Sequence, residues 1–196
     1  MTSQKIAISL VAVALFVGSM TAHAADFDVG KKAYLRRDYA TALRIFRQLA
    51  AQGNASSQTM MGAMYSEGLG VPQDYGEALK WYRKAADQGY ALAQYNLGFM
   101  YRMGQGVEQD YTLALRWYRM AADQGYAQAQ FNLGVMYVKG QGVTQNYVQA
   151  YLWFTIAATQ GQTDVGKWRD LLAKKMTPAQ ISEAQRLARE WKPKRK

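Results

Sequence analysis

The stretch GQGVEQDYTLALRWYRMAADQG, residues 104–125, decides the fold because it occurs three times. Close copies lie 36 residues upstream, as GLGVPQDYGEALKWYRKAADQG (68–89), and 36 residues downstream, as GQGVTQNYVQAYLWFTIAATQG (140–161). Adjacent repeat units are identical at 21 of 36 positions. A fixed period of about 20–50 residues is typical of solenoids. Features that recur in every unit are therefore expected to serve packing rather than catalysis. The complete units are 54–89, 90–125 and 126–161.

Each unit is predicted to contain two helices joined by a glycine-containing loop. In the middle unit, apolar residues in 91–103 recur at the i, i+3, i+4 spacing of one helical face. A residue with a short polar side chain then precedes the second helix, where it can cap the first free amides. The predicted N-caps are Asp74, Asp110 and Asn146. The predicted helix-ending glycines, which can adopt the left-handed conformation, are Gly89, Gly125 and Gly161.

The segments on either side of the three units read as further helices. Residues 25–53 form a shortened copy and predict a leading helical hairpin. Residues 162–191 predict two capping helices, the second starting at Thr177-Pro178, because a solenoid must cover its last apolar face. The basic tail 192–196 is expected to be disordered.

The N-terminus has the pattern of a cleaved export signal. Lys5 precedes an apolar run over 6–20, and Ala22 and Ala24 form an A-x-A site. The run is short for a membrane-spanning helix, which needs about 20 residues. We expect cleavage of residues 1–24, no stable membrane insertion afterwards, and a periplasmic or secreted protein.

The composition excludes several kinds of chemistry. The chain has no cysteine, and its single histidine, His23, lies in the predicted leader. Disulfides, zinc sites of the usual Cys/His kind and His- or Cys-based catalysis are therefore excluded from the remainder. The sequence predicts no catalytic residue, no metal site and no cofactor.

The repeated pattern A-x-A-Q-Y-N-L-G-x-M-Y-x-x-G-x-G-V-x-x-D-Y-x-x-A-L-x-W-Y-x-x-A-A-x-Q-G closely resembles the Sel1-like repeat, a relative of the tetratricopeptide repeat. The resemblance covers 54–161 in three copies, and 25–53 looks closer to a tetratricopeptide repeat. It implies an all-α, right-handed solenoid of antiparallel helix hairpins that acts as a protein-interaction adaptor. Some secreted members are rich in cysteine, which this chain lacks.

Features that suggest a chemical site have simpler structural explanations because they recur in each unit. The glycine loops lack the strand and the Lys-Ser/Thr of a phosphate-binding loop and are predicted to be interhelical turns. The recurring aspartates read as caps rather than as paired catalytic acids. The recurring tryptophans, which a ligand could stack on, are predicted to pack in the core; they are Trp81, Trp117 and Trp153.

The resemblance to tetratricopeptide repeats also implies a concave groove lined by the first helix of each unit. Residues flanking the inward-packing Leu97, Gly98 and Tyr101, with their counterparts, are the candidate protein-binding residues. Asn96 and Asn132 suit an extended peptide backbone, because an amide both donates and accepts. The candidates are Tyr95, Asn96, Phe99, Arg102, Met103, Phe131, Asn132, Val135, Lys139, Met60, Glu67, Lys31 and Tyr34.

We therefore expect a non-enzymatic module that binds a peptide or protein in this groove. One alternative is a binder of anionic envelope surfaces or polymers, because the net charge is +10 and residues 162–196 hold ten of the cations. A cell-wall or β-lactam hydrolase ranks last, since its usual motifs are missing. Nucleic acid is not expected as a partner of an exported protein. Partner identity, pathway and oligomeric state stay open.

Overall fold

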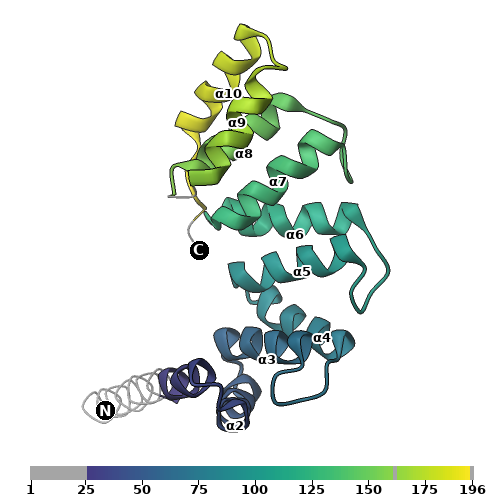
Figure 1. Ribbon diagram of the computed structural model, residues 1–196, viewed down its shortest axis with the longest axis vertical. Helices are drawn as coiled ribbons and strands as arrows, with labels where there is room; N and C mark the ends of the chain where they lie inside the picture. Colours follow the sequence, from purple (N-terminus) through teal and green to yellow (C-terminus); the bar gives the residue numbers. More distant parts are fainter. Residues whose placement is uncertain (1–25, 161–162, 195–196) are drawn as a thin grey trace, which may run out of the picture.

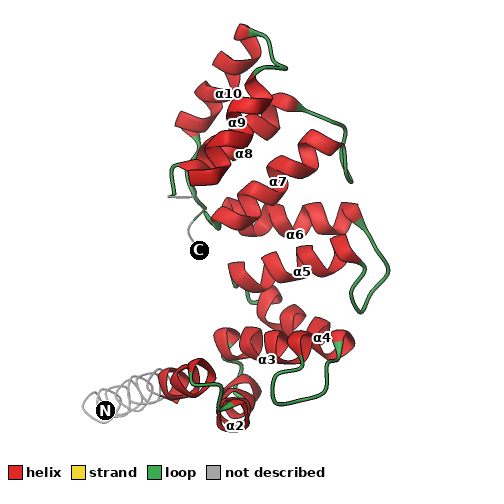
Figure 2. Cartoon of the chain, viewed as in Figure 1, coloured by secondary structure: helices red, strands yellow, loops and turns green. Residues whose placement is uncertain are grey.

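The computed structural model describes residues 26–160 and 163–194, and every regular element in these residues is an α-helix (Figures 1 and 2). The all-α prediction is confirmed. A helical segment over 26–35 comes first. The predicted leader, residues 1–24, and the predicted helix end at Gly161 lie outside the described residues. The helices that follow are α2 (Tyr39–Ala51), α3 (Ala55–Glu67), α4 (Tyr75–Asp87), α5 (Ala91–Met103), α6 (Tyr111–Asp123), α7 (Ala127–Lys139), α8 (Tyr147–Ala158), α9 (Thr163–Ala173) and α10 (Pro178–Glu190).

The helices stack in sequence order as antiparallel hairpins. Helices α3 and α4 form one hairpin, α5 and α6 the next, and α7 and α8 the third. Each hairpin packs on its neighbour through α4 against α5 and α6 against α7. Figure 1 shows the hairpins following one another along the long axis of the molecule. We call the segment 26–35 and α3, α5, α7 and α9 the first helices, and α2, α4, α6 and α8 the second helices.

A glycine in the first helix allows the second helix to approach closely. A Cβ atom on Gly98 would lie 2.7 Å from Cδ1 of Tyr118, whose ring is fully buried. Real Cβ atoms do not come this close to a ring, so any larger residue would push the helices apart. The same contact occurs in each hairpin, in the pairs Gly30–Phe46, Gly62–Tyr82, Gly98–Tyr118 and Gly134–Phe154.

Buried glutamines join each hairpin to the next. Gln94 donates from Nε2 to the Ala86 carbonyl at 3.3 Å, and its Oε1 accepts a 2.7 Å bond from Gln124. Buried amides are stabilising only when they are hydrogen-bonded, and this pairing satisfies both ends of the side chain. The neighbouring units repeat it with the pairs Gln88–Gln58 and Gln160–Gln130.

The loops have the structure predicted from their glycines and caps. Asp110 accepts a 2.9 Å bond from the backbone amide of Leu113, and Asp74 and Asn146 cap their helices in the same way. Gly106 has φ +69°, and a Cβ there would lie 2.6 Å from the Tyr75 carbonyl carbon. Glycine is therefore required in this interhelical turn by both backbone conformation and space.

The tryptophans are less buried than predicted. Trp153 is 1% exposed, but Trp81 and Trp117 are only half-buried, so the prediction of a core position holds fully for Trp153 alone. A cationic side chain lies over each half-buried ring. Lys84 Nζ is 4.5 Å from the Trp81 ring centroid, and Arg83 Cζ is 5.1 Å from the Trp117 ring centroid. In each complete unit the aromatic residue that follows the tryptophan is buried, because it faces the glycine of the first helix.

The C-terminal helices close the solenoid differently from the repeats. Helices α9 and α10 both pack against α8, so α10 does not take the place of a second helix beside α9 (Figure 1). Asp170 occupies the position in α9 that Gly98 and Gly134 occupy in α5 and α7. An exposed carboxylate there cannot accept a buried ring, and the stack of hairpins ends at this point.

The basic tail is partly ordered, which corrects the expectation of disorder for residues 192–194. The Lys194 backbone amide donates to the Asp123 carbonyl at 2.8 Å, and its Nζ lies 2.9 Å from Asp123 Oδ2. Trp191 packs edge-on against Trp153, with the ring centroids 6.2 Å apart, and so directs the chain back toward α6. The Lys194 side chain is 79% exposed, and solvent screening there leaves the ion pair with only a small contribution to stability.

The glycine contact can be tested with the same substitution at two sites. We expect Gly98→Val to lower the free energy of unfolding by about 1–3 kcal/mol, because the added methyls overlap the Tyr118 ring. Gly166→Val in α9 is the control, since a Cβ there meets nothing within 4 Å. Urea unfolding followed by circular dichroism measures both; equal losses at the two sites would contradict the packing role.

Candidate functional site

The first helices form one face of the solenoid, and a hollow of about 220 Å³ opens on it between α3 and α5. Its floor includes the Tyr82 ring, which rests against Gly62. Four of the predicted protein-binding residues, Glu67, Tyr95, Asn96 and Phe99, meet in this hollow, which we call the first hollow. Its lining is completed by Ser66, Met100 and Gln105.

The other predicted residues lie on the same row of helices but outside the first hollow. Phe131, Asn132, Val135, Arg102 and Met60 are half-buried, as is Tyr34. Lys31, Met103 and Lys139 are exposed. The role of these side chains in binding a partner stays a prediction.

The amides of Asn96 and Asn132 are available for binding. Both side chains are half-buried, and neither has a hydrogen-bond partner within the described residues. They lie at equivalent positions of α5 and α7, one 36-residue period apart. A partially exposed amide without an internal partner can donate to and accept from a peptide backbone.

Arg102 lies in the last turn of α5, beside the first hollow. Its guanidinium carbon lies 5.3 Å from the Phe99 ring centroid. The pKa of Tyr118 is raised to about 12, because the effect of burial outweighs the opposite effect of the nearby Arg102, which lowers the pKa. Among the described residues neither Arg102 Nε nor the Tyr118 hydroxyl has a partner with good hydrogen-bond geometry, so we attribute the effect of Arg102 mainly to its charge.

A second hollow, of about 420 Å³, opens between α7 and α9. We call it the last hollow. It lies two repeat periods from the first, and most of its lining corresponds to the lining of the first hollow. The counterparts of Ser66, Tyr82, Asn96, Phe99 and Met100 are Val138, Phe154, Trp168, Leu171 and Leu172. Lys174 and Lys175 complete the lining.

Sequence reasoning missed Trp168 and Leu171 because it treated α9 only as a cap. Trp168 is 53% and Leu171 58% exposed, which is unusual for large apolar side chains. The Trp168 ring lies 6.0 Å from the Phe131 ring, so α9 continues the face formed by α5 and α7. The signal was present in the repeat period, because 36 residues after Asn132 and Val135 lie Trp168 and Leu171.

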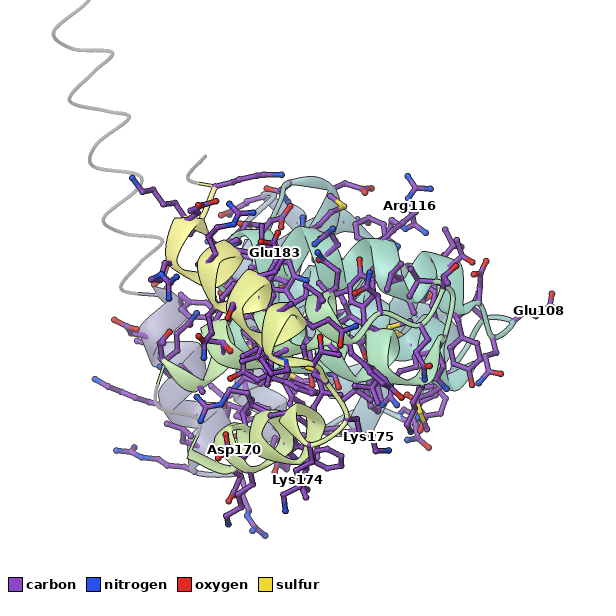
Figure 3. All side chains as sticks on the ribbon, turned by 90° about the horizontal axis from the view of Figure 1, so that it is seen from above. Glu108, Arg116, Asp170, Lys174, Lys175 and Glu183 are labelled. Atoms are coloured by element: carbon purple, nitrogen blue, oxygen red, sulfur yellow. The ribbon has the colours of Figure 1, made fainter. Side chains whose placement is uncertain are left out.

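The two hollows differ in charge. Glu67 lines the first hollow, and its negative charge contributes, after burial, to the raised pKa values of Tyr34 and Tyr82. Lys174 and Lys175 line the last hollow, and within the described residues no carboxylate pairs with either. Figure 3 shows both lysines, which lie in the turn after α9, in the lower part of the view, and Arg116 in the upper part.

Much of the positive charge of the C-terminal helices is neutralised locally. Arg186 bonds to both Glu183 and Glu190 on α10. On α9, Lys167 pairs with Asp164 and Arg169 with Asp170. These pairs reduce the support for the whole C-terminal region as one basic surface and leave Lys174 and Lys175 as a distinct pair of cations.

The site has the chemistry of a binding surface. In the described part of the chain, no group of three or more His, Cys, Asp or Glu side chains is placed to hold a metal ion. None of the helices in residues 26–160 and 163–194 combines the length and apolar character needed to cross a membrane. The hollows instead offer aromatic walls, unpaired amides and isolated charges.

These features define a helical-hairpin solenoid with a binding face on its first helices. The family model described as Sel1 repeat matches residues 27–54, 55–90, 91–126 and 127–162. The chain therefore belongs to the Sel1 repeat family, whose repeats are non-catalytic scaffolds that generally mediate protein–protein interaction. The match also includes the shortened leading unit at 27–54, whose sequence had looked closer to a tetratricopeptide repeat.

Two solved structures are similar to this chain. A Sel1 repeat protein from Oxalobacter formigenes is 36% identical, with a TM-score of 0.71 over 74% of this chain. The protein c5321, a protective antigen present in uropathogenic Escherichia coli strains, displays the same fold and is 30% identical, with a TM-score of 0.60 over 86% of this chain. The chain spans 60% and 45% of these two proteins, respectively. No curated protein matches it.

Proposed function

We propose that this protein binds an extended segment of a partner protein along the face formed by α3, α5, α7 and α9. The observation that supports this most directly is the pair of hollows at equivalent positions of the repeat, with different linings. The floor of each hollow is constrained by the contact of a second-helix ring with a first-helix glycine. The lining side chains above it are not constrained in this way and differ from unit to unit.

An extended peptide fits the spacing of this face. Packed helices lie about 8–10 Å apart, and an extended chain advances about 3.3 Å per residue. Successive first helices are separated by the second helix that packs between them, so one repeat corresponds to at least about three peptide residues. Asn96 and Asn132 would hold the peptide backbone, and the hollows would receive side chains. This arrangement gives affinity through the backbone and selectivity through the side chains.

The binding proposal is tested by selecting peptides from a displayed random library on the purified protein. We expect the selected peptides to bind 5- to 100-fold more weakly to Asn96→Ala/Asn132→Ala, because each lost hydrogen bond costs about 0.5–1.5 kcal/mol. The stability of this variant should be unchanged, since neither amide has an internal partner.

The matched control is Gln48→Ala/Gln185→Ala, which removes two exposed amides on α2 and α10, outside the face. Its peptide affinities, measured by isothermal titration calorimetry, should equal those of the wild type. A library that yields no peptide, or peptides that bind both variants equally, would overturn the proposal.

We also propose that the protein is exported to the periplasm or secreted. The support is the sequence of the leader, with Lys5, the apolar run over 6–20 and the Ala22-x-Ala24 site. The partner would then be an envelope or extracellular protein. Nucleic acid, which is not expected in that compartment, is not proposed as a partner.

Export is tested by fusing residues 1–40 to alkaline phosphatase, which is active only outside the cytoplasm. We expect active enzyme and, in the intact protein, a mature N-terminus at Ala25. Val11→Asp/Leu15→Arg should abolish activity, because charges in the apolar run prevent recognition as a signal. Active enzyme from that variant, or full-length protein with Met1 in the periplasm, would contradict the proposal.

A further inference from the structure

The lining of the last hollow indicates which kind of peptide the protein binds. This inference rests on the proposed peptide-binding function. Five of its seven lining side chains are apolar, namely Val138, Phe154, Trp168, Leu171 and Leu172. Its volume of about 420 Å³ falls within the range of about 300–1,000 Å³ common for ligand pockets. The lining therefore suits one large apolar side chain rather than a polar one.

The end of the solenoid leaves this apolar surface uncovered. Because α10 packs on α8, no helix within the described residues covers this face of α9. Trp168 and Leu171 stay more than half exposed, although burying such side chains is favourable. Leu172, the residue next to Leu171, is 5% exposed and anchors α9 to the core. Trp168 and Leu171 therefore line the hollow without being needed to hold α9 in place.

The positive charge of two lysines beside the last hollow favours a bound peptide with acidic residues next to its apolar side chain. Lys174 and Lys175 lie in the turn that follows α9, and both line the hollow together with Leu171. Neither has a carboxylate partner among the described residues. Glu67 gives the first hollow the opposite charge, so the face discriminates between the two ends of a charged peptide.

We propose that the last hollow binds a large apolar side chain of an acidic peptide, with Lys174 and Lys175 contacting carboxylates adjacent to that side chain. The carboxylates belong to Asp, Glu or the C-terminus of the partner. The peptide then runs along the face with its acidic end at α9 and any basic residue at Glu67. Apolar burial supplies affinity, while the lysines supply orientation and selectivity.

The test uses a Gly/Ser dodecapeptide with Phe-Asp-Asp at its centre. Two matched probes replace the phenylalanine by alanine or both aspartates by lysine. The fluorescence of the five tryptophans reports binding, and Trp168→Phe identifies the part of the change that comes from the hollow. We expect the first probe to bind at least about tenfold more tightly than either replacement, with an affinity that falls as salt is added.

Two variants test the residues themselves. Lys174→Glu/Lys175→Glu should weaken the Phe-Asp-Asp probe at least about tenfold and favour the lysine probe. Leu171→Asp should weaken it without unfolding the protein, because this side chain is 58% exposed. The matched control is Arg44→Glu/Arg116→Glu, which reverses two exposed cations elsewhere (Figure 3 shows Arg116) and should keep the order of the probes.

The outcomes separate this inference from the proposed function. Library peptides that depend on Asn96 and Asn132, combined with no preference for the Phe-Asp-Asp probe, would overturn the inference alone. Failure of every peptide would overturn both. A tryptophan change with palmitate or phosphatidylglycerol vesicles, but not with the probe, would also overturn it and identify the hollow as a site for anionic amphiphiles.

Discussion

The contact between a first-helix glycine and a second-helix aromatic ring is the constraint on which the rest of the structure depends. In each hairpin the ring lies where the Cβ of any other residue would be, as with Gly98 and Tyr118. This closeness sets the distance between the two helices and therefore the position of the next hairpin. The glutamine pairs, such as Gln94 with Gln124, then connect hairpins that already have the correct spacing. Binding residues are added to a scaffold whose geometry is fixed by other residues.

The same constraint explains where the solenoid ends and where its binding face stays open. Asp170 replaces the glycine in α9, so no aromatic ring packs there, and α10 turns to α8 instead. The face of the first helices nevertheless continues through Trp168 into α9. The lining positions still recur there at the 36-residue period, although the glycine does not. The last hollow therefore lies between α7, which belongs to a complete hairpin, and α9, which has no second helix packed beside it in the described residues.

The sequence predicted the helices, the caps and the turns well because these depend on local, repeated signals. Asp110 shows this, since it caps α6 through the amide of Leu113, whereas Gly106 also depends on its close approach to Tyr75 of the preceding repeat. Where the outcome depends on packing between distant segments, prediction failed or was incomplete. Trp191, from the far end of the chain, packs on Trp153 and helps to bury it, whereas Trp117 stays half-buried, and the order of the tail follows from Asp123. Four predicted residues did converge in the first hollow, whereas Trp168 was missed because α9 was judged by its terminal position rather than by its place in the repeat period.

The most direct test of the account is to map where a selected peptide lies. A photoreactive benzoylphenylalanine is placed at the apolar position of the peptide, and the cross-linked residues are identified by mass spectrometry. The account predicts cross-links on the first helices α5, α7 and α9, with Asn132 and Trp168 among the nearest targets. Cross-links concentrated around Arg83 and Trp117, on the second helices, would contradict the claim that the face of the first helices is the binding surface.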